Sequence, residues 1–120
     1  MSEPRYRLCA LADIPEGASK GFAHPDPITE ARDPRGLFVV RRGRQLHAYR
    51  NRCPHRGLEL NWVPDRFLDR EGALILCSAH GALFDIDNGF CISGPCQGQQ
   101  LEALPTEVVD GEVYVTLAPA

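Results

Sequence analysis

Glycine and proline occur along the whole chain and interrupt nearly every window that is long enough to form a regular helix. The 120 residues include 11 glycines and 10 prolines, and no stretch of about a dozen residues keeps the helical spacing of apolar side chains. Because glycine weakens a helix interior and proline lacks the backbone N–H donor, long helices are disfavoured. The sequence therefore predicts a β-rich fold with many turns.

Short segments with alternating apolar or β-branched residues lie between these turns and predict strands. The expected strands are Tyr6–Leu11, Leu37–Arg41, Gln45–Arg50, Ala73–Leu76, Ala82–Ile86, Phe90–Ile92, Glu107–Val109 and Glu112–Leu117. Asn88-Gly89 and Asp110-Gly111 are typical of hairpin turns, and Val113, Val115 and Leu117 are expected to face the core. The even spacing of these segments indicates an all-β protein, an antiparallel sandwich or small barrel.

Length and composition fit a single folded domain covering residues 1–120. Hydrophobic residues make up 43% of the chain and charged residues 24%, which disfavours disorder. The apolar runs are too short to cross a bilayer, and residues 1–20 contain no apolar segment typical of a secretory signal. We therefore expect a cytoplasmic protein with no membrane partner.

The net charge of −3 is unevenly distributed. Six of the arginines lie between Arg41 and Arg56. We interpret them as strand residues whose side chains point to water, in preference to a surface that binds an acidic partner. Because the chain is acidic overall and has one lysine, no nucleic-acid partner is expected.

Two short segments each pair a cysteine with a histidine in a glycine-bearing loop: residues 53–57, with Cys53 and His55, and residues 77–81, with Cys77 and His80. Four such ligands on two loops predict a metal site. Zinc would bind all four ligands on one ion, whereas a Rieske-type [2Fe–2S] cluster takes two cysteines on one iron and two histidines on the other. The interleaved order favours the cluster, because common zinc fingers keep like ligands paired.

At these residues the sequence resembles the Rieske [2Fe–2S] domain, and in particular the small soluble Rieske-type ferredoxins. CPHRG (53–57) and CSAHGALFD (77–85) resemble the two ligand loops, and Gly94-Pro95 stands where the family has the proline loop that covers the cluster. The resemblance implies a Rieske-like fold with a two-loop cluster-binding subdomain at about residues 51–96. It also implies that Cys53 and Cys77 bind the inner iron of one cluster and His55 and His80 the outer iron.

The function implied by the resemblance is electron transport and not catalysis, with no catalytic residues in the chain. Such a ferredoxin carries single electrons between a reductase and a terminal oxygenase or other oxidoreductase. One alternative is an accessory subunit similar to the small subunit of nitrite reductase. A different class of function is a zinc module for protein interaction without redox activity, which the ligand chemistry leaves open.

The sequence also departs from the quinol-oxidising members of the resembled family. Their additional loop cysteines are replaced by Leu58 and Ala79, and their hydrogen-bonding serine and tyrosine by Ala82 and Phe84. Fewer hydrogen bonds to the cluster sulfurs leave an added electron less stabilised. The expected midpoint potential is therefore near the low end of the Rieske range, roughly −150 mV.

Three further cysteines complete the set of five. Cys91 and Cys96 flank Gly94-Pro95, and we interpret them as small buried residues near the cluster in preference to a disulfide or a second redox centre. Cys9, in the first expected strand, is interpreted as a buried hydrophobic residue.

Overall fold

A computed structural model describes residues 5–23, 36–54, 59–61, 63–78 and 81–117. The elements in chain order are β1 (Arg5–Ala10), the 3-10 turn η1 (Leu11–Asp13), β2 (Ser19–Phe22), β3 (Leu37–Arg42), β4 (Gln45–Arg50), β5 (Leu74–Leu76), β6 (Leu83–Asp85), β7 (Cys91–Ser93), β8 (Ala103–Leu104), β9 (Thr106–Val109) and β10 (Glu112–Thr116). Every strand pairing is antiparallel. This confirms the all-β antiparallel fold class. In the described ranges, η1 is the only helical element, and no helix there is long and apolar enough to cross a membrane.

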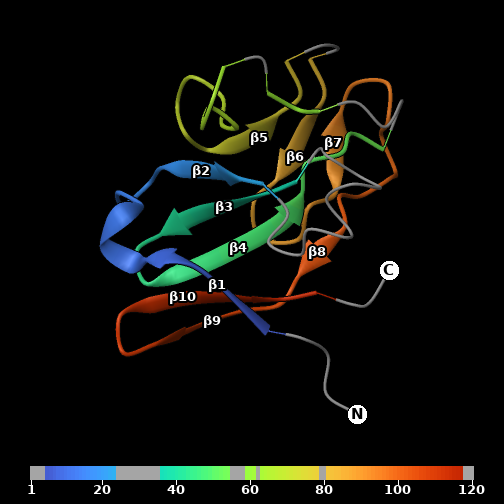
Figure 1. Ribbon diagram of the computed structural model, residues 1–120. Coiled ribbons are helices and arrows are strands. Elements are labelled where there is room, and N and C mark those ends of the chain that lie inside the picture. The colour runs from blue at the N-terminus through green and yellow to red at the C-terminus, as the bar shows by residue number, and fades with distance from the viewer. Residues whose placement is uncertain (1–4, 24–35, 55–58, 62, 79–80, 118–120) are drawn as a thin grey trace.

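The strands form three small sheets, with the orders β1-β10-β9, β2-β3-β4-β8 and β5-β6-β7. Figure 1 shows the sheet that contains β3 and β4 between the other two, with β9 and β10 on one side and β5, β6 and β7 on the other. The β5-β6-β7 sheet brings together the segments that precede and follow the second predicted ligand loop.

The first four residues of β3 are buried because this strand of the middle sheet separates two apolar cores. On β3, Phe38 and Val40 enter the core shared with the β5-β6-β7 sheet, whereas Leu37 and Val39 enter the core shared with β1 and β10. Alternate side chains of a strand point to opposite faces, so four consecutive apolar residues are needed to fill both cores. The continuous apolar run of β3 is therefore explained by its central position.

The β9–β10 hairpin confirms the expected turn at Asp110-Gly111. Both residues have positive φ angles, 51° and 76°, which is the backbone conformation of a tight primed turn. Val113, Val115 and Leu117 are buried as predicted. By contrast, β2 and β8 were not predicted, and the strand after Asn88-Gly89 begins at Cys91.

Several of the clustered arginines have partners within the fold. Arg41 donates to the Ile14 carbonyl over 2.9 Å, Arg50 pairs with Glu102, and Arg42 lies 3.8 Å from a carboxylate oxygen of Asp87. Arg42 is half exposed and fits the expectation of strand residues that point to water, whereas the Arg41 and Arg50 side chains are partly buried against the fold.

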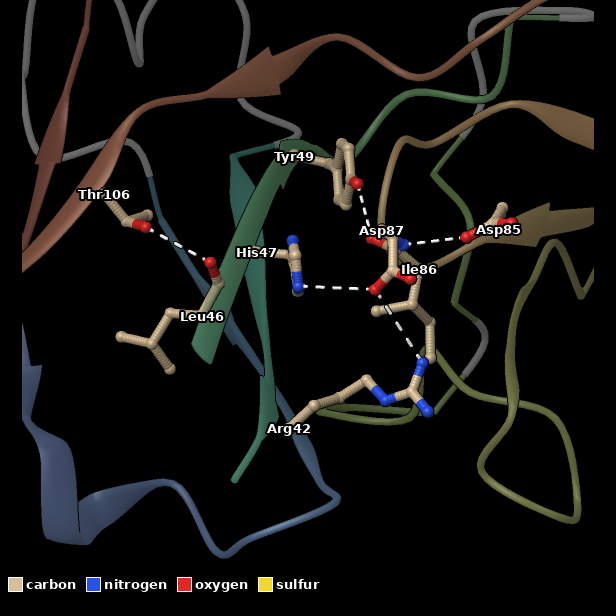
Figure 2. Close-up of polar contacts among 8 residues, drawn as sticks. All are labelled: Arg42, Leu46, His47, Tyr49, Asp85, Ile86, Asp87 and Thr106. Carbon is tan, nitrogen blue, oxygen red and sulfur yellow. Dashed lines mark hydrogen bonds and ion pairs between the residues drawn. The ribbon is translucent and has the colours of Figure 1, made fainter. Parts of the chain in front are cut away.

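Polar contacts from β4 fix the turn between β6 and β7 to the middle sheet (Figure 2). The Tyr49 hydroxyl donates to the Ile86 carbonyl over 2.6 Å, and His47 Nε2 lies 3.6 Å from Asp87 Oδ1. Gly89 approaches the Tyr49 ring so closely that a Cβ at this glycine would lie 2.7 Å from a ring carbon. These contacts position the β5-β6-β7 sheet, which leads to the second predicted ligand loop.

Replacing Tyr49 by phenylalanine should destabilise the protein by about 1–3 kcal/mol, because the buried Ile86 carbonyl would lose its hydrogen-bond donor. Urea unfolding of the wild-type protein and the variant at neutral pH measures this difference. Burial raises the pKa of Tyr49 to about 12, so the hydroxyl keeps its proton at that pH. Tyr114→Phe is the matched control, because the Tyr114 ring contacts Arg5 through its face, which phenylalanine retains. An equal loss of stability in both variants would contradict the assigned role of the Tyr49 hydroxyl.

Candidate metal centre

The first predicted ligand loop begins after β4 and is closed by a buried asparagine. Asn51 Oδ1 accepts a hydrogen bond from the Leu60 backbone N–H over 2.8 Å, and Asn51 Nδ2 donates to Asn61 Oδ1 over 2.9 Å. Asn51 is the one buried polar or charged residue among those described, and an amide at such a position is stabilised by bonds of this kind. Cys53 lies inside the closed loop, with no exposed surface.

The second predicted ligand loop begins after β5 and is fastened to the first. Within it, the Cys77 N–H donates to the Ala82 carbonyl over 2.9 Å, and the Gly81 N–H donates to the Cys77 carbonyl over 2.9 Å. The Ser78 N–H donates to the Leu60 carbonyl over 2.7 Å and joins the two loops directly. Gly81 has a φ of 71°, a conformation that glycine adopts without strain.

The turn at Gly94-Pro95 contacts the second of these loops. A Cβ at Gly94 would lie 2.8 Å from the Ala82 Cα, so only glycine allows this approach of the two backbones. Next to the turn, the Cys96 thiol interacts with Cys91 and Cys53. Burial is the main cause that raises the pKa of Cys96 to about 12, and these two neighbouring thiols raise it further. The turn therefore lies against the Cys77 loop, and the neighbouring Cys96 shares a buried core with Cys53.

Two of the four predicted ligands can be placed in the structure. Cys53 and Cys77 are both completely buried and belong to the same apolar core. His55 and His80 lie outside the described residues, as do Leu58 and Ala79. Among the described residues no group of three metal-binding side chains occurs. Two buried thiols on adjoining loops fit the sulfur-ligated end of an iron–sulfur cluster, since thiolates are the usual ligands of such iron.

The residues that close the loops were not predicted. Asn51, Leu60 and Asn61 carry no motif of their own, and their bonds exist because the fold brings residues about ten positions apart into contact. An asparagine two residues before a predicted ligand is the only signal in the sequence, and it is a weak one because asparagine is common in loops.

Together, the fold and the joined cysteine loops define a β-sheet metalloprotein. The chain belongs to the Rieske [2Fe–2S] domain family, whose sequence profile matches residues 5–113. Its cofactor is one Rieske-type [2Fe–2S] cluster. Family membership confirms the expected fold family and cofactor.

The similar proteins include ferredoxins of dioxygenase systems. Ferredoxin CarAc from Metapseudomonas resinovorans is 30% identical over 115 residues, which cover 96% of this chain and 95% of that protein. The ferredoxin of carbazole 1,9a-dioxygenase from Nocardioides aromaticivorans IC177 is 26% identical, with a TM-score of 0.70 and coverage of 97% of this chain and 98% of that one. These similarities confirm the expected Rieske-type ferredoxin, an electron carrier and not an enzyme.

A further solved structure shows such a ferredoxin fold in an assembly. It is a complex of reduced oxygenase and oxidised ferredoxin in carbazole 1,9a-dioxygenase. The matched chain is 27% identical, with a TM-score of 0.73, and the match covers 97% of this chain and 95% of that chain.

Proposed function

We propose that Cys53 and Cys77 bind one iron of the cluster and that His55 and His80 bind the other. The supporting observation is the bond of 2.7 Å from the Ser78 N–H to the Leu60 carbonyl, which joins two loops whose cysteines are both fully buried. When bound, the cluster accepts and releases one electron at a time. The chain's own residues bury the sulfur ligands, exclude water from them and hold the two loops together.

A spectroscopic measurement tests the histidine assignment separately from function. Electron spin echo spectroscopy of the reduced wild-type protein is expected to show couplings from two imidazole nitrogens. His55→Cys and His80→Cys should each lose one of these couplings, whereas His47→Gln should keep both, because His47 lies on β4 beside Asp87. Two retained couplings in either cysteine variant would contradict the proposed ligand set.

We further propose that the protein receives electrons from a flavoprotein reductase and passes them to a terminal oxygenase or other oxidoreductase. The proposal is supported by the relatives, which are named as dioxygenase ferredoxins, and by the oxygenase–ferredoxin complex. We place this activity in the cytoplasm. We also propose that residues 1–120 form one Rieske domain with a cluster-binding subdomain at about residues 51–96.

The proposed partners predict how many electrons each cluster takes up. Anaerobic titration with a flavoprotein reductase and its nicotinamide donor should deliver one electron per cluster, and adding the oxidised partner oxygenase should restore the oxidised visible spectrum. Uptake of no electron from any reductase, while dithionite reduces the cluster, would contradict the carrier role proposed for these partners.

The Ala82→Ser variant tests the expected low midpoint potential. The Ala82 carbonyl accepts a hydrogen bond from the Cys77 N–H over 2.9 Å, so a hydroxyl at residue 82 would lie close to the Cys77 loop. If the new hydrogen bond stabilises the reduced cluster by about 1.4 kcal/mol more than the oxidised cluster, the midpoint potential rises by about 60 mV. Redox titration followed by visible absorption measures this shift.

Ala48→Ser is the matched control, because Ala48 is also buried but lies in the core shared with β1 and β10. Its midpoint should equal that of the wild-type protein. A wild-type midpoint well above zero, or an equal shift in both variants, would contradict the hydrogen-bond explanation.

A further inference from the structure

Cys91 and Cys96 lie side by side under the Gly94-Pro95 turn, and we propose that they are a site of reversible disulfide formation. The two sulfur atoms are 3.1 Å apart. Because a disulfide bond is about 2.05 Å long, the thiols need to approach by only about 1 Å. As expected from the sequence, both residues are buried. Their closeness to each other was not predicted, and it revises the interpretation drawn from the sequence, which preferred simple burial to a disulfide.

The backbone around the pair forms a closed loop that holds the two residues in place. The Cys91 N–H donates to the Gln99 carbonyl over 2.8 Å, and the Gln99 N–H donates to the Cys96 carbonyl over 2.9 Å. Gln99 thus connects the backbones of both cysteines. The sulfur atoms therefore meet through the hydrogen bonding of the loop and do not depend on a flexible approach.

In the dithiol state the pair forms a short hydrogen-bond chain. The Cys96 thiol donates to Cys91 Sγ over 3.1 Å, and the Cys91 thiol donates to the Ser93 carbonyl over 3.2 Å. Both hydrogens thus have acceptors in the buried site, which stabilises the reduced form. The dithiol form is therefore satisfied within the loop.

The proposal also accounts for the odd number of cysteines. Cys53 and Cys77 are the proposed iron ligands, and Cys9 lies in the other core, beside Val113 and Val115. The remaining two cysteines are the adjacent pair. Each of the five cysteines then has one role, as an iron ligand, a core residue or a member of the adjacent pair. The fold itself does not depend on disulfide bonds.

Access to the pair requires the loop to open. Residues 92–95 and 97–100 are exposed on either side of Cys96, and Gly94 and Gly98 have φ angles of 104° and 93°. Both cysteines are buried in the closed loop, so a reagent reaches their sulfur atoms only when the loop opens. We therefore expect oxidation to be slower than for an exposed thiol pair.

The oxidant is a low-molecular-weight disulfide such as oxidised glutathione. One cysteine thiolate attacks a glutathione sulfur, forms a mixed disulfide and releases one glutathione thiol. The second cysteine thiolate then attacks the protein sulfur of this mixed disulfide, forms the Cys91–Cys96 bond and releases the second glutathione thiol. Two electrons and two protons pass from the protein to glutathione, and excess reduced glutathione reverses both steps.

The experiment uses the complete holoprotein in buffers of oxidised and reduced glutathione under anaerobic conditions. After acid quenching and unfolding, free thiols are alkylated and the peptides are mapped by mass spectrometry, while the visible spectrum reports the cluster before quenching. We expect a Cys91–Cys96 linkage at high oxidised glutathione, its loss at high reduced glutathione, and an unchanged cluster spectrum throughout.

Three variants separate the pair from general oxidation. Cys9→Ser should form the linkage as the wild-type protein does. Cys91→Ser and Cys96→Ser should form no intramolecular disulfide, and their spectra report whether they fold and bind the cluster. Full alkylation of Cys91 and Cys96 in the oxidised wild-type sample would overturn the proposal, as would a linkage of either one to Cys9, Cys53 or Cys77.

Discussion

Replacement of Cys53 by alanine is expected to yield a protein that binds almost no iron. Cys53 is fully buried and lies in the closed loop that is joined to the Cys77 loop. Removing even a residue that only supports a metal ligand lowers metal affinity roughly 10–100-fold, and removal of a ligand itself should exceed this. The loops also lose the cofactor that links them, so the free energy of unfolding should fall together with the cluster.

The measurement is the iron content per chain and the visible spectrum after anaerobic purification. Cys9→Ala is the matched control, because Cys9 is also a buried cysteine but belongs to the core between the middle sheet and β10. It should retain full iron content while losing a small amount of stability through the smaller side chain. Full iron content and an unchanged spectrum in Cys53→Ala would show that this residue is not a ligand.

The second large effect is expected in the double variant His55→Cys, His80→Cys. Two thiolates in place of two neutral imidazoles add two negative charges at the cluster, and reduction would add one more. The midpoint potential should fall from roughly −150 mV toward about −400 mV, the value typical of clusters with four cysteine ligands. Redox titration of the reconstituted variant measures the change, and its absorption spectrum should lose Rieske character.

His47→Gln serves as the control for this pair, since His47 contacts Asp87 on the turn between β6 and β7. Its midpoint should match that of the wild-type protein. If the double variant assembled a cluster with the wild-type midpoint, the histidines would not be the ligands that set the potential.

The strands that could be predicted are those whose own residues contain a strong pattern. Glu112–Thr116 alternates apolar and polar residues and follows Asp110-Gly111, so both its position and its buried face were correct. β2 was missed because Ser-Lys-Gly-Phe has no alternation, and its strand state depends on pairing with β3. β8 has two residues and exists through pairing with β4. Such contacts are a property of the fold and not of the segment.

The same distinction applies to the metal centre. The two cysteine–histidine segments contain the ligand types themselves, and their resemblance to a known family gave the predicted family and cofactor, both of which the comparisons confirm. The bond of Asn51 to Leu60 and the contact between Cys91 and Cys96 depend on loop conformation. Cys91 and Cys96 were expected to be buried, which is correct, but burial alone does not indicate that two sulfurs are neighbours.

The most direct test of the account is a metal and sulfide analysis of protein purified without oxygen. We predict two irons and two acid-labile sulfides per chain, little zinc, and an electron spin resonance signal after one-electron reduction. One zinc per chain with no labile sulfide and no signal on reduction would contradict the account, because the two ligand loops would then hold a structural ion and no electron carrier.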